Sequence, residues 1–167
     1  MRKETYKHYY LVDSCAFGRF IDPECPESTH NILNNIDSGA FYYIPQFCIT
    51  EVFNMFAKWH FCEERIDDSA YLSLRNSFKS LIHDRKVLYP YDLHRYHNLN
   101  CDKIYETEQK TPKPKNKPKL SSFDILIIAM GLELQHIHGS DNVTILSCDE
   151  RLLIIADKLH IKIEEFK

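Results

Sequence analysis

Short apolar runs alternate along the chain with longer segments whose apolar residues recur at helical spacing. The short runs predict strands at 8–12, 41–44, 87–89, 143–146 and 161–163. The longer segments predict helices at 46–60, 67–83, 92–108, 121–138 and 149–159. Strands separated by helices favour a parallel sheet with helices on both faces. We therefore expect an α/β fold, a three-layer α/β/α sandwich with a central parallel sheet of four to five strands.

Two segments depart from the ordinary amphipathic pattern. The helix predicted at 121–138 contains the run ILIIAM, which is apolar nearly all round and predicts a buried helix. The segment 109–119, QKTPKPKNKPK, holds three Pro and five Lys and no acidic residue, so it predicts a solvated loop. We expect residues 1–167 to form a single domain that carries this basic loop.

Composition excludes several classes of protein. With 44% hydrophobic residues in 167, the chain can bury a core, and disorder is excluded as its main state. Its four Gly form no phosphate-binding loop, and no GxSxG motif is present. Six Cys without a CxxC motif favour reduced thiols. No signal peptide or membrane-spanning run is visible, so we expect a cytoplasmic protein without a membrane partner.

Four acidic residues, distant in sequence, fall where the predicted fold would bring them together. Asp13 directly follows the first strand, and Asp149 lies just past the fourth. Glu51 and Asp124 lie in the first turns of two predicted helices, within or beside apolar surfaces. Ligands of open α/β sheets bind at the carboxyl ends of the strands, where these residues converge.

Each acid also has a purely structural explanation. An Asp at a helix start caps the helix or interacts favourably with its dipole, and Glu51 is compatible with a solvated helix face. Structure alone does not explain carboxylates beside apolar helical surfaces, since buried carboxylates are usually paired or metal-bound. A hard divalent cation, Mg²⁺ or Mn²⁺, would relieve the repulsion within such a cluster. The cluster therefore predicts metal-dependent phosphoryl chemistry, with an activated water attacking a phosphodiester.

The motifs that carry these acids resemble the PIN-domain family over nearly the whole chain. They are YYLVDSCAF, IPQFCITEVFNMF, LSSFDILIIAMGLEL and VTILSCDERLLIIADKLHIKI. The resemblance implies a metal-dependent ribonuclease, a group that includes toxins of bacterial toxin–antitoxin pairs and RNA-processing factors. It also implies RNA as substrate and leaves an antitoxin or other regulatory protein open as a partner.

Carried over residue by residue, the resemblance implies that Asp13, Glu51, Asp124 and Asp149 are the catalytic metal ligands. Three further residues would support them: Ser14, Ser147 and Glu150. Many family members carry Asn two residues after the first Asp, where this chain has Cys15.

The basic loop bears on RNA binding. Its lysines precede the helix that carries Asp124, and their positive field would attract an RNA backbone. They are Lys110, Lys113, Lys115, Lys117 and Lys119. The formal net charge of −3 would argue against nucleic-acid binding, but the positions of the charges reverse that argument. Several of the acids belong to the predicted metal centre, while five lysines lie together in one loop without an acid. A solvated loop that does not touch RNA is the alternative.

Other interpretations remain open. The acidic cluster is compatible with a catalytically inactive PIN scaffold that binds RNA or protein. An aspartyl-phosphate enzyme using Asp13 lacks the DxD pattern, because position 15 is Cys. Helical spacing permits a zinc site at His94, His97 and Cys101, although surface histidines on a polar helix are the favoured interpretation. Apolar residues of the helix predicted at 46–60 favour core packing over a homodimer face; they are Phe53, Phe56 and Trp59.

Overall fold

The computed structural model describes residues 8–21, 39–84, 87–112 and 119–165. Its centre is a five-stranded sheet in the order β3-β2-β1-β4-β5, and every neighbouring pair of strands is parallel. The strands are β1 (His8–Val12), β2 (Ala40–Pro45), β3 (Leu88–Tyr91), β4 (Val143–Ser147) and β5 (Lys162–Glu165). The predicted α/β class with a parallel central sheet is confirmed.

The order of the strands creates a switch point between β1 and β4. From β1 the chain adds β2 and β3 on one side, and it then crosses back to place β4 and β5 on the other side. Tyr9 pairs with Val143, and Val12 pairs with Leu146, so the two strands end together. In open α/β sheets, ligands bind at the carboxyl ends of the strands beside this point.

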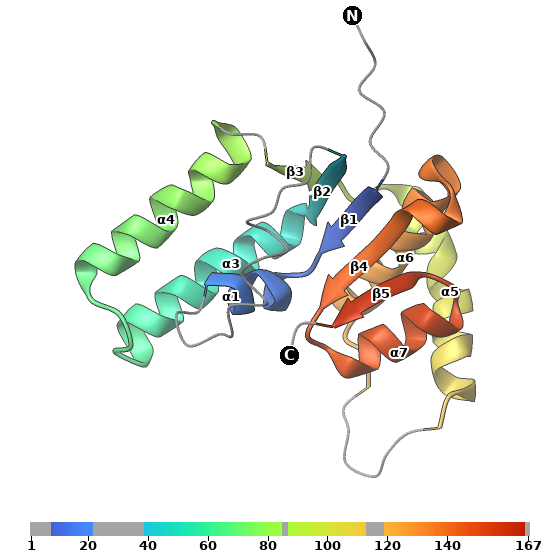
Figure 1. The fold of residues 1–167 in the computed structure, drawn as a ribbon. Helices are drawn as coiled ribbons and strands as arrows, with labels where there is room; N and C mark the ends of the chain where they lie inside the picture. Colours follow the sequence, from blue (N-terminus) through green and yellow to red (C-terminus); the bar gives the residue numbers. More distant parts are fainter. Residues whose placement is uncertain (1–7, 22–38, 85–86, 113–118, 166–167) are drawn as a thin grey trace, which may run out of the picture.

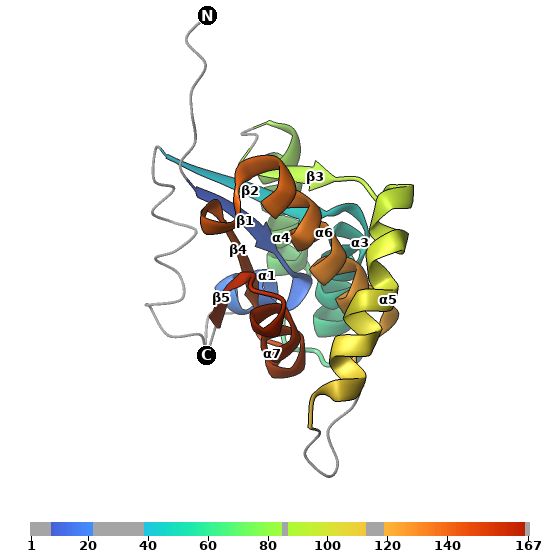
Figure 2. The ribbon, with the colours of Figure 1, turned by 90° about the vertical axis from the view of Figure 1, so that its right-hand side faces the viewer.

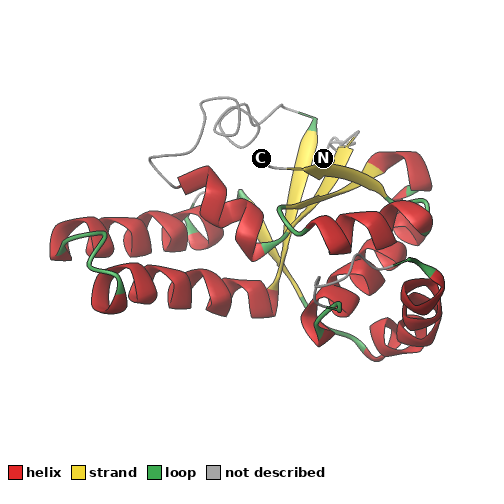
Figure 3. Ribbon diagram, turned by 90° about the horizontal axis from the view of Figure 1, so that it is seen from below, coloured by secondary structure: helices red, strands yellow, loops and turns green. Residues whose placement is uncertain are grey.

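Two groups of helices cover the two faces of the sheet (Figures 1 and 2). One group contains α1 (Ser14–Ile21), α3 (Gln46–Ala57) and α4 (Asp68–His83). The other contains α5 (Arg95–Lys110), α6 (Ser122–His138) and α7 (Glu150–Lys158). Figure 3 shows the strands between these groups, as expected for three layers.

Helix α6 packs closely against the sheet, as the apolar ILIIAM run predicts. Ile127, Ile128 and Met130 are buried. At Gly131 the helix lies so near β4 that a Cβ atom would stand 2.9 Å from Cδ1 of Ile145. A larger side chain would therefore push α6 away from the sheet.

The aromatic residues of α3 belong to the core rather than to a separate exposed face. Phe56 is fully buried, and the half-buried Phe53 packs edge-on against Phe78 of α4. Trp59 is half-buried in a short π-helical segment, Lys58–Cys62, that extends α3. The expectation that these aromatics pack in the core is confirmed.

Two helices differ from the sequence prediction. Helix α1 was not predicted, because it has only eight residues and includes Gly18, a residue of low helix propensity. Helix α5 continues through Lys110, so the first two residues of the predicted loop at 109–119 are helical instead. Lys113, Lys115 and Lys117 lie outside the described residues.

Within the described ranges, no helix is both long and apolar enough to cross a membrane.

Candidate metal centre

The four acidic residues singled out from the sequence line one cleft at the carboxyl end of β1 and β4. The cleft has a volume of about 310 Å³. It is lined by Asp13, Ser14, Cys15, Glu51, Ser121, Phe123, Asp124, Ile127, Cys148 and Asp149. The acids come from four separate elements, so the fold brings together residues up to 136 positions apart.

Asp13 lies at the bottom of this arrangement, directly after β1, and is 6% exposed. Its Oδ2 accepts hydrogen bonds from Ser147 Oγ at 2.7 Å and from Cys15 Sγ at 2.9 Å. Hydrogen bonds to the ionised form offset the cost of burying a carboxylate. The surroundings therefore hold Asp13 in one orientation.

Ser14 connects the first two acids. Its hydroxyl lies 2.7 Å from Glu51 Oε2 and 3.3 Å from Asp13 Oδ1. Glu51 reaches this position from the second turn of α3 and is half-buried. Because one hydroxyl can donate only one proton, the shorter distance identifies Glu51 as the main acceptor. Ser14 thus lies where the sequence placed a supporting residue.

Asp124 has both a structural and an electrostatic role. Its Oδ2 accepts a hydrogen bond from the Ser121 backbone, and Ser121 Oγ accepts one from the Asp124 backbone, which forms the capping box of α6. Burial raises the pKa of Asp124 despite these hydrogen bonds, and the negative charges of Asp149 and Asp13 raise it further. The acids therefore lie close enough to repel one another.

Asp149 is the N-cap of α7. Its Oδ1 accepts hydrogen bonds from the backbone N–H groups of Arg151 and Leu152, at 2.7 and 2.9 Å. Its own N–H donates to Ser147 Oγ, which ties it to the residue that supports Asp13. Glu150, by contrast, is exposed at the start of α7, and the lining of the cleft includes Asp149 instead.

Cys15 occupies the position where many PIN domains carry Asn, and here it supplies local support. Its thiol donates to Asp13 and accepts a hydrogen bond from the Cys148 backbone at 3.1 Å. A hydrogen bond with the Cys148 side chain, together with burial and the charge of Asp13, raises the pKa of the Cys15 thiol. The protonated thiol can therefore act as a donor, a role that the sequence did not reveal.

The chemistry of this cleft fits a hard divalent cation. Its charged groups are carboxylates, and none of the described residues that line it is basic. Ligand atoms of Asp13, Glu51 and Cys48 lie within 4.8 Å of one another. Burial and the charge of Asp13 raise the pKa of Cys48. Its sulfur is in addition a soft ligand, which a hard cation such as Mg²⁺ disfavours. Oxygen ligands of this kind suit Mg²⁺ or Mn²⁺.

A second network holds both ends of the basic segment against α7. Arg151 is buried, and its guanidinium donates to the backbone carbonyls of Glu108, Thr111 and Pro112. The Glu108 carboxylate accepts a hydrogen bond from the Leu120 backbone. We call these hydrogen bonds of Arg151 and Glu108 the Arg151 clip, and residues 109–119 the basic segment. Because Arg151 follows Asp149 by two residues, the clip joins the basic segment to a helix that borders the cleft. Lys110 and Lys119 are both exposed at its ends.

Comparisons with known proteins agree with this architecture. One similar structure is that of VapBC2 from Rickettsia felis bound to a DNA fragment from the VapBC2 promoter. The TM-score is 0.61 and the sequences are 16% identical; the match covers 95% of this chain and 99% of that chain. Another is that of FitAcB from Neisseria gonorrhoeae, with a TM-score of 0.62 and 13% sequence identity; the match covers 92% of this chain and 95% of that chain. The chain has the PIN fold. No family model and no curated protein matches the sequence.

The PIN fold of this chain carries a second cluster, between α5 and α6. Glu133 accepts hydrogen bonds from Tyr91 Oη and from His97 Nε2, the latter at 2.5 Å, and His94 Nδ1 lies 3.5 Å from its other oxygen. His97 is fully buried, so its assignment as a surface histidine was wrong. The sequence did not identify Glu133, because it lies 36 residues beyond His97 on another helix.

Hydrogen bonding argues against a metal at this second cluster. His97 Nδ1 accepts a hydrogen bond from the His94 backbone N–H, so the ring proton resides on Nε2 and donates to Glu133. That nitrogen has no lone pair to offer a metal. Cys101 is directed to the His97 carbonyl instead, with its Sγ 3.5 Å from that oxygen. The cluster is therefore a structural hydrogen-bond network.

Proposed function

We propose that this chain is a metal-dependent endoribonuclease with a PIN fold, using Mg²⁺ or Mn²⁺ at the acidic cleft. The observation that carries the proposal is the convergence of Asp13, Glu51, Asp124 and Asp149 on one cleft whose described lining contains no basic residue. An acidic cleft of this kind repels a phosphodiester unless a cation is bound. Binding of the phosphodiester substrate in this cleft would therefore depend on binding of the metal ion.

The side chains of the cleft have separable roles. Ser147 and Cys15 hold Asp13, and Ser14 orients Glu51. The hydrogen bonds of Asp149 use Oδ1, and those of Asp124 use Oδ2, so each side chain has a second oxygen outside its cap. A bound divalent cation would lower the pKa of a water molecule and offset charge on the leaving oxygen.

The choice of RNA rests on the PIN resemblance and on the position of the basic segment. The Arg151 clip fixes the ends of that segment beside α7, so its lysines would add a positive field to one side of the cleft. This arrangement would hold a polyanion whose scissile phosphate reaches the acids.

We also propose an antitoxin-like protein partner. Two of the similar structures, VapBC2 and FitAcB, are toxin–antitoxin complexes. A small open reading frame beside the gene would encode the partner. Co-purification of its product with this chain, together with inhibition of RNA cleavage, is the expected result. A product that binds without changing cleavage would contradict the proposal of an inhibitor.

The function is tested by cleavage of a single-stranded RNA by the purified chain. We expect cleavage with Mg²⁺ or Mn²⁺, loss with a chelator, and recovery when the metal is restored. Asp13→Asn and Asp124→Asn should abolish cleavage while the far-ultraviolet circular dichroism stays unchanged.

A suitable control is Asp157→Asn, which removes an exposed carboxylate near the end of α7, away from the cleft. It should cleave at the unmodified rate. Full activity of the Asp13→Asn/Asp124→Asn double variant would refute the site. RNA binding without cleavage in every metal would instead support the inactive-scaffold alternative.

A further inference from the structure

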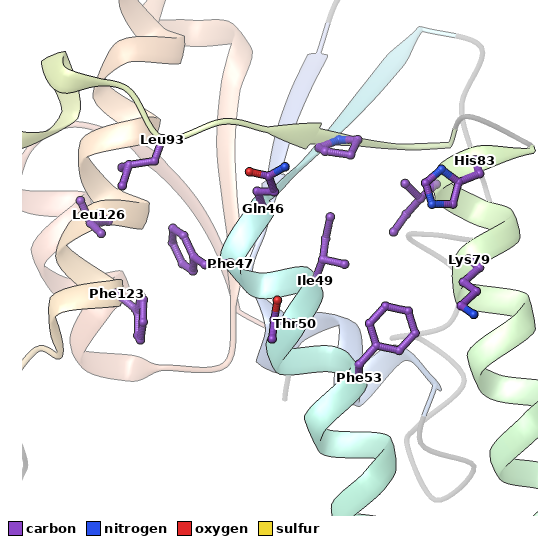
Figure 4. Close-up of a pocket in the computed structure, with 12 residues that line it drawn as sticks. Gln46, Phe47, Ile49, Thr50, Phe53, Lys79, His83, Leu93, Phe123 and Leu126 are labelled. Carbon is purple, nitrogen blue, oxygen red and sulfur yellow. The ribbon is translucent and has the colours of Figure 1, made fainter.

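An apolar groove adjoins the acidic cleft and shares one residue with it. The groove has a volume of about 650 Å³ and lies between α3, α4, β3 and the start of α6 (Figure 4). Phe123 lines both the groove and the cleft. The ring therefore stands at the boundary between the proposed site of phosphodiester cleavage and the groove.

Phe123 is unusual within its helix. It is 49% exposed, whereas most of the apolar residues that follow it in α6 are buried. It directly precedes Asp124 in the first turn. Phe47 of α3 stacks against it, with ring centroids 5.0 Å apart and an angle of 29° between the ring planes. Since one face rests on Phe47, the exposed surface belongs to the remainder of the ring.

Polar groups stand at the same end of the groove as this aromatic pair. Gln46 and Thr50 are exposed on α3, one and three residues from Phe47, and lie on either side of it (Figure 4). An amide and a hydroxyl can each donate and accept hydrogen bonds. A flat aromatic surface beside such groups matches an unpaired nucleobase, which has a π-face and a polar edge.

We propose that an unpaired base of the RNA substrate, adjacent to the scissile phosphate, stacks on Phe123. This inference rests on the proposed function, because it names how the same site would position its substrate. Continuity of the groove with the cleft through Phe123 favours a base over an apolar protein segment. A protein segment would also touch the part of the groove away from Phe123, at Phe53 and His83 (Figure 4), which a single base beside the cleft does not reach.

The first test compares variants of Phe123 on a single-stranded RNA with one mapped cleavage position. Phe123→Ala should lower kcat/KM by about 5- to 150-fold, mainly through KM, because base–aromatic stacking has about that value per base. Phe123→Tyr keeps the ring and should stay within about twofold of the unmodified chain. Ile137→Ala, at an exposed position in the last turn of α6, is the matched control and should have no effect.

The second test removes the base instead of the ring. An RNA with an abasic residue beside the scissile phosphate should be cleaved equally by the unmodified chain and by Phe123→Ala. Persistence of the full Phe123→Ala defect on every abasic RNA would overturn the proposal, as would equal cleavage of intact RNA by both proteins.

A binding measurement separates this proposal from the proposed activity. A single-stranded RNA with the fluorescent base 2-aminopurine beside the scissile phosphate is titrated with the protein, with Ca²⁺ as the divalent cation, and the fluorescence is followed. Quenching that requires Phe123 supports stacking even if no RNA is cleaved, in which case the proposed activity fails alone. Absence of Phe123-dependent quenching overturns stacking, whether or not RNA is cleaved. Loss of quenching in Phe53→Ala as well as Phe123→Ala would point to a larger occupant of the whole groove and also overturn it.

Discussion

Ser147 is a small residue whose hydroxyl links two of the acids in the cleft. It is fully buried, donates to Asp13 Oδ2 at 2.7 Å and accepts from the Asp149 backbone at 3.0 Å. Its loss would leave a buried carboxylate and a backbone N–H each with one partner fewer. Unpaired buried polar groups are among the larger sources of destabilisation.

Ser147→Ala should therefore lower the free energy of unfolding by about 1.5–3 kcal/mol, the range for a hydrogen bond to a charged group. Urea unfolding measures the change. Ser73→Ala, on the exposed side of α4, is the control and should stay within about 0.5 kcal/mol. Equal stability of Ser147→Ala and the unmodified chain would show that Asp13 does not depend on this donor.

Glu133 predicts a dependence of stability on pH. Burial alone would raise the pKa of Glu133, but hydrogen bonds from Tyr91 and His97 and the nearby imidazoles outweigh it and hold the pKa below 4.5. The folded carboxyl thus binds its proton less tightly than the unfolded one. Its contribution is complete above the unfolded pKa and is lost as pH falls through the lower, folded value.

Glu133→Gln should be less stable than the unmodified chain by about 1.5–3 kcal/mol at pH 7, where the charged acceptor is lost. The difference should shrink as the pH is lowered below about 4.5, where the unmodified carboxyl also becomes neutral. Unfolding free energies measured from pH 3 to 8 provide the check. A difference that stays constant over this range would show that the charge of Glu133 makes no contribution.

At the scale of the elements, two of the proposed ligands also begin helices. The sequence allowed either role for each acid, and the structure shows that Asp149 is the N-cap of α7 and that Asp124 completes the capping box of α6. Capping and metal binding can coexist because they use different oxygens. The two roles can be separated by substitutions that keep or remove the side-chain acceptor.

Asp149→Asn keeps an N-cap acceptor, whereas Asp149→Ala removes it. We expect Asn to change the unfolding free energy by less than about 0.5 kcal/mol and Ala to lower it by about 1 kcal/mol. Both should weaken Mn²⁺ binding, followed by calorimetric titration. Unchanged Mn²⁺ affinity in both variants would leave Asp149 with a capping role alone.

The basic segment predicts a salt effect that belongs to an element rather than to one residue. Its clip uses backbone groups and the side chains of Arg151 and Glu108, so replacing the lysines leaves the clip intact. We expect replacement of Lys110, Lys113, Lys115, Lys117 and Lys119 by Gln to weaken RNA binding. The slope of log affinity against log salt should become shallower by about 0.7 for each phosphate that the variant no longer neutralises. An unchanged slope would assign these lysines to a solvated loop that does not touch RNA.

At the scale of the whole molecule, some features of the fold follow from short stretches of sequence, and others depend on packing between distant segments. Alternation of strands and helices predicts a parallel sheet because each strand must return through a crossover helix. Asp13 and Asp149 could be placed at its carboxyl edge because they directly follow strands. The order of the strands, with β1 beside both β2 and β4, depends on packing between distant segments. The hydrogen bonds of Cys15 and the pairing of His97 with Glu133 also depend on packing between distant segments, so neither could be predicted from the sequence.

The proposed function depends on one claim, that the four carboxylates together hold a catalytic divalent metal ion. Anomalous diffraction from crystals grown with Mn²⁺ tests it without reference to any RNA substrate. We predict a manganese peak in the cleft lined by Asp13, Glu51, Asp124 and Asp149, and its loss in Asp13→Asn/Asp124→Asn. An empty cleft at saturating Mn²⁺, or a peak only beside His94 and Glu133, would contradict the proposal.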